Sequence, residues 1–115
     1  MAVPPMLKEI WRHLFKKRAT IMYPFKEREK IHVPEGLRGK IEYNRDLCIG
    51  CGLCVKFCPT GAAELTTDER GRRVIFHMDR CCFCAQCEEV CPKKAIKLTP
   101  HFEMAAFKRE DLVVK

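Results

Sequence analysis

The alternation of apolar and polar residues predicts short strands in the second part of the chain. Ile41 and Tyr43 alternate with charged neighbours, which is typical of an opening β-strand. Residues 73–77 are rich in β-branched and aromatic side chains, and they follow a polar stretch that ends in Gly71. Because a glycine in such a stretch marks a turn between strands, we expect residues 63–77 to form a β-hairpin.

A helical period marks the beginning of the chain. Over residues 5–18 apolar side chains recur at helical spacing on one face, and Pro5 suits the first turn. The apolar positions are Met6, Leu7, Ile10, Trp11, Leu14 and Phe15, and the basic positions on the other face are Lys8, Arg12, Lys16 and Lys17. Pro24 and Pro34 favour an extended connector over residues 19–40. An extended C-terminal tail is expected after Pro100, with apolar residues at Phe102, Met104, Phe107 and Leu112.

The central part of the chain contains a duplicated cysteine motif. The pattern C-x2-C-x2-C-x3-C-P begins at Cys48 and again, 33 residues later, at Cys81. Further identities at the same offset join Asp46, Ala62, Leu65 and Thr66 to Asp79, Ala95, Leu98 and Thr99. Each copy is expected to continue into a short helix and a short strand, at residues 53–57 and 63–67 in the first copy and at residues 86–90 and 95–99 in the second. The pattern predicts two equivalent halves related by a pseudo-two-fold axis.

The spacing of the cysteines is typical of iron–sulfur proteins. Three thiolates on one tight loop can each bind a different iron of a cubane cluster, and in two-cluster ferredoxins the fourth cysteine of such a motif binds the other cluster. The first predicted [4Fe-4S] cluster has as ligands Cys48, Cys51, Cys54 and Cys91, and the second has Cys81, Cys84, Cys87 and Cys58. With four protein ligands per cluster, no iron has an open position for a substrate. This favours outer-sphere electron transfer, and we predict no catalytic residue.

Other features of the motifs leave alternatives open. Paired C-x2-C motifs also bind zinc, so a zinc-stabilised interaction module is the remote alternative. Cys82 falls outside the triplet spacing and is interpreted as a non-ligand packed near the cluster. Gly50 and Gly52 give the first loop conformational freedom, whereas the second loop has other residues there. Nearby cations would raise the reduction potentials or form a solvated face: Lys56, Arg80, Lys93 and Lys94.

Composition and charge narrow the function classes. The 115 residues carry a net charge of +7, and 47% of them are hydrophobic, which argues against a disordered chain. Neither a G-x-G-x-x-G nor a P-loop motif is present, and the length excludes a large enzyme fold. The longest apolar stretch, residues 47–55, is too short to span a membrane. The start of the chain does not resemble an export signal, so we expect a reducing compartment in which nine cysteines do not form disulfides.

The basic character is concentrated before the cysteine motifs. Residues 1–40 hold ten Lys or Arg and four Asp or Glu, whereas residues 41–115 hold twelve and eleven. The amphipathic helix could pack on the cysteine domain, but a membrane surface or a larger subunit is the favoured partner of residues 5–18. Nucleic acid is not expected, because aromatic residues are not interleaved with the basic face. The predicted organisation is a basic docking segment (1–40), a two-cluster domain (41–100) and a C-terminal docking tail (101–115).

With its flanks included, the sequence resembles the two-[4Fe-4S] ferredoxin-like subunit (subunit I type) of complex I and of the related membrane-bound, energy-converting [NiFe] hydrogenases and sulfur-reductase complexes. Tyr23-Pro24 and Arg38-Gly39 resemble that family's elements before the first motif, and residues 102–113 resemble its segment after the second. The compact length favours the archaeal hydrogenase or sulfur-reductase branch. The resemblance implies an α+β fold: a duplicated ferredoxin-like core with an N-terminal amphipathic helix and an extended C-terminal tail.

The same resemblance implies a function and a location. The chain would be a non-catalytic electron-transfer subunit, peripheral on the cytoplasmic side of the cell membrane. Its partners would be the large catalytic subunit, the small cluster-bearing subunit and a membrane-arm subunit. A freely diffusing two-[4Fe-4S] ferredoxin is the main alternative. Ordinary small ferredoxins are usually acidic and begin close to the first motif, so the basic leader argues against it.

Overall fold

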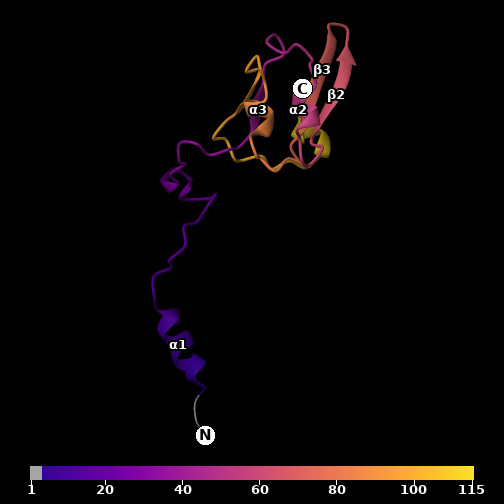
Figure 1. The fold of residues 1–115 in the computed structure, drawn as a ribbon. Coiled ribbons are helices and arrows are strands. Elements are labelled where there is room, and N and C mark those ends of the chain that lie inside the picture. Colours follow the sequence, from indigo (N-terminus) through magenta and orange to yellow (C-terminus); the bar gives the residue numbers. More distant parts are fainter. Residues whose placement is uncertain (1–3) are drawn as a thin grey trace. The chain divides into compact units, whose positions relative to one another are not determined.

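The longest strands form the hairpin that the sequence predicts. In the computed structural model, which describes residues 4–115, β2 (Ala63–Asp68) pairs antiparallel with β3 (Gly71–His77), as Figure 1 shows. Gly71 has a φ of +105° at the start of β3, a conformation that costs glycine little. The third strand of this sheet, β5 (Val113–Val114), pairs with the other edge of β3, which is therefore the central strand.

A second sheet joins the two ends of the duplicated region. The predicted opening strand, β1 (Ile41–Tyr43), pairs antiparallel with β4 (Ile96–Leu98). Glu42 lies opposite Lys97, and this cross-strand pair of opposite charges supports the register. Backbone hydrogen bonds from Gly39 N to Thr99 O and from Lys40 N to His101 O, both 2.8 Å long, extend the pairing beyond the strands.

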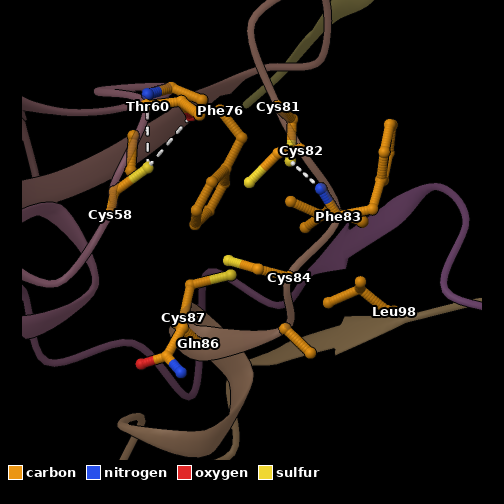
Figure 2. Close-up of a pocket in the computed structure, with 14 residues that line it drawn as sticks. Cys58, Thr60, Phe76, Cys81, Cys82, Phe83, Cys84, Gln86, Cys87 and Leu98 are labelled. Atoms are coloured by element: carbon orange, nitrogen blue, oxygen red, sulfur yellow. Dashed lines mark hydrogen bonds between the residues drawn. The ribbon is translucent and has the colours of Figure 1, made fainter.

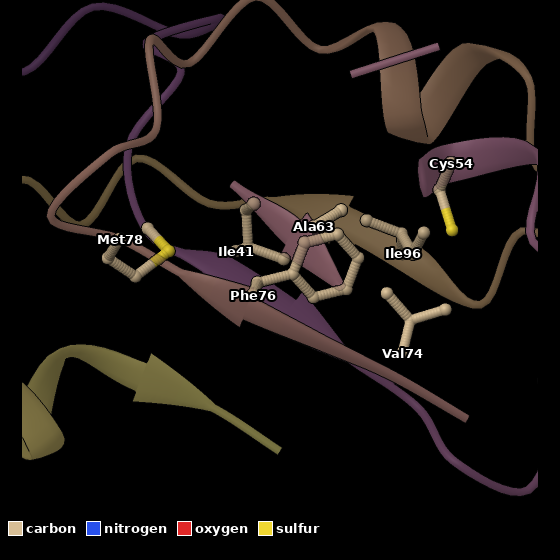
Figure 3. Close-up of a cluster of buried hydrophobic side chains, with 7 residues drawn as sticks. All are labelled: Ile41, Cys54, Ala63, Val74, Phe76, Met78 and Ile96. Atoms are coloured by element: carbon tan, nitrogen blue, oxygen red, sulfur yellow. The ribbon is translucent and has the colours of Figure 1, made fainter. Parts of the chain in front are cut away.

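The apolar core lies where these elements meet. The two short helices, α2 (Leu53–Lys56) and α3 (Gln86–Glu89), follow the cysteine loops and confirm the predicted helical segments. Figure 3 shows the buried side chains of the core, which come from both sheets, from α2 and from the end of β3: Ile41, Cys54, Ala63, Val74, Phe76, Met78 and Ile96. The ring of Tyr43 packs edge-on against Phe76, with centroids 5.9 Å apart. Both halves of the duplication therefore share one core.

The C-terminal residues differ from the extended tail that the sequence predicts. After an irregular stretch they form a short 3₁₀ helix, η2 (Arg109–Leu112), and then β5. Met78 N donates a hydrogen bond of 2.9 Å to Leu112 O, and Arg109 pairs with Asp79 at 2.8 Å. Leu112 and Val114 pack against the core because they are apolar, and this contact orders the end of the chain. The compact unit that contains the cysteines accordingly runs from Val33 to Lys115.

A separate unit ends at His32 and contains the predicted amphipathic helix. The helix α1 (Pro5–Leu14) has proline in its first turn and buries none of its residues. The helix ends at Leu14, four residues before the end that the apolar period predicts at residue 18. Between residues 4 and 115 no helix is both long and apolar enough to span a membrane.

The segment after α1 is organised around one carboxylate rather than being simply extended. Glu27 accepts hydrogen bonds from Arg18 Nη2 and Met22 N, both at 2.8 Å, and from Lys30 Nζ at 2.7 Å. The hydrogen bond from Lys30, followed by that from the Met22 backbone, lowers the pKa of Glu27. These bonds gather residues 18–30, including the 3₁₀ helix η1 (Arg28–Lys30), into a local turn.

We expect Gly39→Ala to destabilise the unit that begins at Val33. A Cβ at this buried position would overlap the carbonyl oxygen of His101 and come within 2.8 Å of that of Thr99, both backbone atoms. Overpacking of this kind costs about 1–3 kcal/mol in the free energy of unfolding. Thermal unfolding of the anaerobically purified protein measures the effect, with Glu35→Ala at an exposed position as the control. Equal midpoints for the two variants would contradict the close packing at Gly39.

Candidate functional site

The eight predicted ligand cysteines line two cavities, four in each. The first cavity is lined by Cys48, Cys51, Cys54 and Cys91. The second is lined by Cys58, Cys81, Cys84 and Cys87, together with Cys82, and is drawn in Figure 2. Each cavity takes three cysteines from one motif and one from the other. This grouping is the crossed one that the sequence predicts, and the binding of iron by these thiols stays a prediction.

The walls of the two cavities repeat the internal duplication. Most residues that line the first have a counterpart 33 positions away that lines the second. Val74, Ile96 and Lys93 line the first cavity. Their counterparts in the second cavity are Ile41, Ala63 and Thr60, respectively. The pseudo-two-fold symmetry inferred from the sequence therefore extends from the cysteines to the apolar walls around them.

The backbone of the cysteine loops follows the same symmetry even where the residue types differ. Positive φ angles occur in three pairs 33 residues apart: Gly50 and Phe83 (+65° and +52°), Gly52 and Ala85 (+76° and +66°), and Gly61 and Lys94 (+63° and +49°). Non-glycine residues adopt this left-handed conformation at a cost, so the second loop holds strained positions that the first fills with glycine. The loop geometry is thus imposed by the cysteine spacing rather than by glycine.

This backbone directs N–H groups at cysteine sulfurs. Gly50 N and Phe83 N donate to the Sγ atoms of Cys48 and Cys81, each at 3.4 Å. In the same way, Ala62 N and Ala95 N donate to the Sγ atoms of Cys58 and Cys91, each at 3.3 Å. N–H groups aimed at sulfur stabilise negative charge on it, as a thiolate bound to a metal requires.

The thiols differ in how easily they ionise. Burial raises the pKa of Cys54 to about 11 and that of Cys87 to about 12, and burial also raises the pKa of Cys81. At Cys58 burial acts in the same direction, but backbone hydrogen bonds from Ala63, Thr60 and Ala62 and the Thr60 hydroxyl outweigh it, so its pKa is lowered. Because metal ligands must be thiolates, binding of a cationic iron core would release protons from the buried cysteines.

Charged side chains near the cavities include two that the sequence analysis missed. Arg38 donates to the carbonyl oxygen of Cys84 at 3.0 Å, and Arg45 to that of Cys48 at 3.5 Å. Of the cations named from the sequence, Lys93 lines the first cavity, whereas Arg80 pairs with Glu64 at 2.9 Å. Cys82 is exposed at the second cavity. The sequence could have indicated the contact of Arg45, because Arg45 is three residues before Cys48. It gave no such signal for Arg38, which is 46 residues before Cys84.

The hydroxyl of Tyr43 lies beside the first cysteine motif. It is buried, and the groups next to it are the Cys48 side chain and the backbone of Val74. Burial, and then the adjacent Cys48 side chain, raise the pKa of Tyr43 to about 12. A neutral thiol is a weak acceptor, whereas an iron-bound thiolate would accept a hydrogen bond from the phenol. The donor set of four thiols with N–H groups directed at sulfur fits a [4Fe-4S] cluster in each cavity.

Comparison with known proteins gives the family. The 4Fe-4S dicluster domain family matches residues 19–95. The chain is 45% identical over 118 residues to NADH-quinone oxidoreductase subunit I of Pseudomonas putida, covering 93% of this chain and 63% of that protein. It is also 45% identical over 121 residues to the protein of the same name from Cronobacter sakazakii, covering 93% of this chain and 66% of the relative.

A solved structure is similar over nearly the whole chain. A chain of the membrane-bound sulfane sulfur reductase, an archaeal respiratory membrane complex, matches with a TM-score of 0.64 and 26% identity, covering 97% of this chain and 60% of its own length. The present chain thus spans less than two thirds of the length of the relatives named first. Two cysteine-lined cavities around one core agree with the family match over residues 19–95. The chain belongs to the 4Fe-4S dicluster domain family.

Proposed function

We propose that the two cavities hold two [4Fe-4S] clusters with crossed ligands. Cys48, Cys51, Cys54 and Cys91 would bind the first cluster, and Cys58, Cys81, Cys84 and Cys87 the second. The support is the lining of the cavities, each of which receives three cysteines from one motif and one from the other. Cys82 would remain a non-ligand, because its counterpart at the same offset in the first loop is Ile49, which cannot bind iron.

The function that this arrangement supports best is electron transfer within a membrane-bound, complex I-like oxidoreductase. The clusters would act as one-electron carriers. The chain's own residues would complete the coordination of every iron, which leaves no open position for a substrate. Two clusters built on one shared core form a short and rigid path for electrons. Support for the membrane-bound assembly comes from relatives described as NADH-quinone oxidoreductase subunit I and as a membrane-bound sulfane sulfur reductase.

The flanking segments would dock the subunit into its complex. Residues 1–40 and 101–115 are the proposed docking segments around the cluster domain at 41–100. Exposed apolar side chains support this role in both flanks: Met6, Ile10, Trp11, Leu14, Phe25 and Phe107. The proposed partners are the large catalytic and small cluster-bearing subunits, with a membrane-arm subunit or the membrane surface contacting α1. The proposed location is peripheral, on the cytoplasmic side of the cell membrane.

Affinity purification from the native host tests whether the protein works as a subunit. Membranes solubilised in a mild detergent should yield the tagged chain together with larger subunits in constant proportion, because the apolar flanks would be covered in the complex. The measurement is mass spectrometry and gel filtration of the purified material. Recovery of the cluster-loaded chain alone from the soluble fraction would instead indicate a freely diffusing ferredoxin.

A further inference from the structure

The two halves of the duplication differ in the side chains that they expose around their cavities. The first copy exposes five large apolar side chains: Leu47, Ile49, Leu53, Phe57 and Leu65. The positions 33 residues later hold Arg80, Cys82 and Gln86, which are exposed, and Val90 and Leu98, which are partly buried. Because both copies have the same loop backbone, the fold itself does not require an apolar surface at this place. The exposed apolar residues of the first copy therefore indicate a contact outside the fold.

Four of these side chains surround the first cavity and form one surface, here called the apolar face: Ile49, Leu53, Phe57 and Leu65. Ile49 and Leu53 line the cavity. Phe57 follows Leu53 by one helical turn at the end of α2, where Phe57 N donates to Leu53 O at 3.0 Å. A Cβ on Gly52 would lie 3.8 Å from Leu65 Cδ1, so Leu65 lies beside the cysteine loop. The apolar face is thus continuous with the mouth of the first cavity.

The charged residues next to the apolar face are cations. Lys56 belongs to α2, and Lys93 lines the first cavity. Arg72 lies against the cysteine loop, because a Cβ on Gly50 would be 2.5 Å from its carbonyl oxygen. All three side chains are exposed, and none of them takes part in an ion pair within residues 4–115. A surface with carboxylates at matching positions would neutralise them.

We propose that the apolar face docks the cluster domain on another protein subunit, whose facing surface is apolar in its centre and acidic at its rim. The proposal rests on the electron-transfer function proposed above and adds a partner surface beside the first cluster. Exposed apolar patches with a polar rim are typical of protein interaction sites. Cys51 is exposed at this place, so a docked subunit would keep water away from the first cluster and shorten the path of an electron to the partner.

A protein fits the apolar face better than a lipid surface does. The loop of residues 48–52 between the exposed side chains is neither helical nor part of a strand. The hydrocarbon region of a bilayer offers no partner for the backbone groups of such a loop, so irregular backbone is not exposed to lipid. A protein surface can satisfy these groups directly or through bridging water. The apolar side chains of α1, by contrast, are carried by a regular helix.

The test places a photo-crosslinker on the apolar face of the full chain in its native complex. Tagged Phe57→p-benzoylphenylalanine is produced in the native host, irradiated in membranes and purified, and the linked peptides are identified by mass spectrometry. Because benzophenone reacts with C–H bonds in contact with it, we expect a link to one larger subunit that also co-purifies in constant proportion. The linked peptide should be apolar and flanked by Asp or Glu. Lys97→p-benzoylphenylalanine, exposed on β4, is the matched control and should give little of this product.

Charge placed on the apolar face should weaken the complex. Phe57→Glu combined with Leu65→Glu should lower the amount of larger subunit recovered per tagged chain at least about tenfold, because docking would bury unpaired charges. Lys97→Glu changes the net charge by the same two units on the second half and should leave the recovery unchanged. A carbodiimide joins an amine to a carboxylate in contact with it, so it should link Lys56 to an Asp or Glu of the same subunit.

Four results would overturn the proposal: a link from position 57 to phospholipid, no link from it in an intact complex, no carbodiimide link from Lys56, or equal recovery of the doubly charged variant and Lys97→Glu. Neither Phe57 nor Leu65 lines the two cavities, so the variants should keep about eight irons. An intact, iron-loaded complex without the link contradicts only the docking face. A chain without two clusters, or without larger subunits, contradicts the proposed function and the docking face with it.

Discussion

Replacing Cys58 and Cys81 together by alanine should remove about half of the iron, whereas replacing Cys58 and Cys54 together should remove nearly all of it. Cys58 and Cys81 come from different motifs but line the same cavity, so their joint loss affects one cluster. Cys54 and Cys58 are close in the chain, but Cys54 lines the other cavity, so that pair damages both clusters. The intact protein should hold about eight irons. We expect about four irons in the variant without Cys58 and Cys81, and close to none in the variant without Cys54 and Cys58.

The two variants distinguish crossed from uncrossed ligands because the two arrangements predict opposite results. If each motif bound its own cluster, the Cys54 and Cys58 pair would leave one cluster intact and the Cys58 and Cys81 pair would remove both. Cys82→Ala is the matched control and should retain all of the iron, because Cys82 is exposed and outside the predicted sets. Iron and acid-labile sulfide are measured on anaerobically purified protein.

Placing charge on the apolar face of α1 should release the protein from its membrane. Met6, Ile10 and Leu14 are more than half exposed on one side of the helix, and no residue of the helix is buried. Burial of an aliphatic side chain contributes about 1.5–3 kcal/mol, so Leu7→Asp combined with Ile10→Asp should weaken membrane association at least about 100-fold. The measurement is the fraction of protein that sediments with native membranes, while the iron content should stay unchanged because α1 contributes no cysteine.

A control variant on the basic face of α1 distinguishes the contribution of apolar contacts from that of charge. Lys8→Gln removes one positive charge, which is worth about 1 kcal/mol near an anionic surface, so its effect should be much smaller. Binding of the isolated chain to vesicles that contain phosphatidylglycerol would assign the contact to lipid, and retention in the complex without vesicle binding would assign it to a protein subunit. Full sedimentation of the doubly charged variant would contradict the docking role of α1.

Local patterns predicted much of the fold and the grouping of the cysteines. The hairpin, the opening strand and the two short helices each follow from periodicity and turn residues within a few positions. The crossed ligand sets came from the pattern of two-cluster ferredoxins, and the lining of the two cavities agrees with them. These features depend on residues that are near one another in the sequence or that recur in the duplicated motif. For that reason a single sequence was enough to place them.

The remaining features depend on contacts between distant segments. In the sequence Val113 and Val114 are part of an apolar tail. In the structure they form a strand, because they pair with Phe76 and His77 of β3. Ala85 and Lys94 adopt left-handed conformations that their residue types do not favour, because the cysteine loops require them. The ring of Tyr43 meets Phe76 only after β1 has paired with β4 and packed against β3.

Metal analysis of anaerobically purified protein, combined with EPR, shows whether the two cavities hold two [4Fe-4S] clusters. We expect about eight irons and eight sulfides per chain and negligible zinc, because two complete sets of four thiols line two cavities. Reduction with dithionite should produce low-temperature signals from two [4Fe-4S] clusters. Stoichiometric zinc without iron in freshly purified native protein would contradict the binding of two clusters.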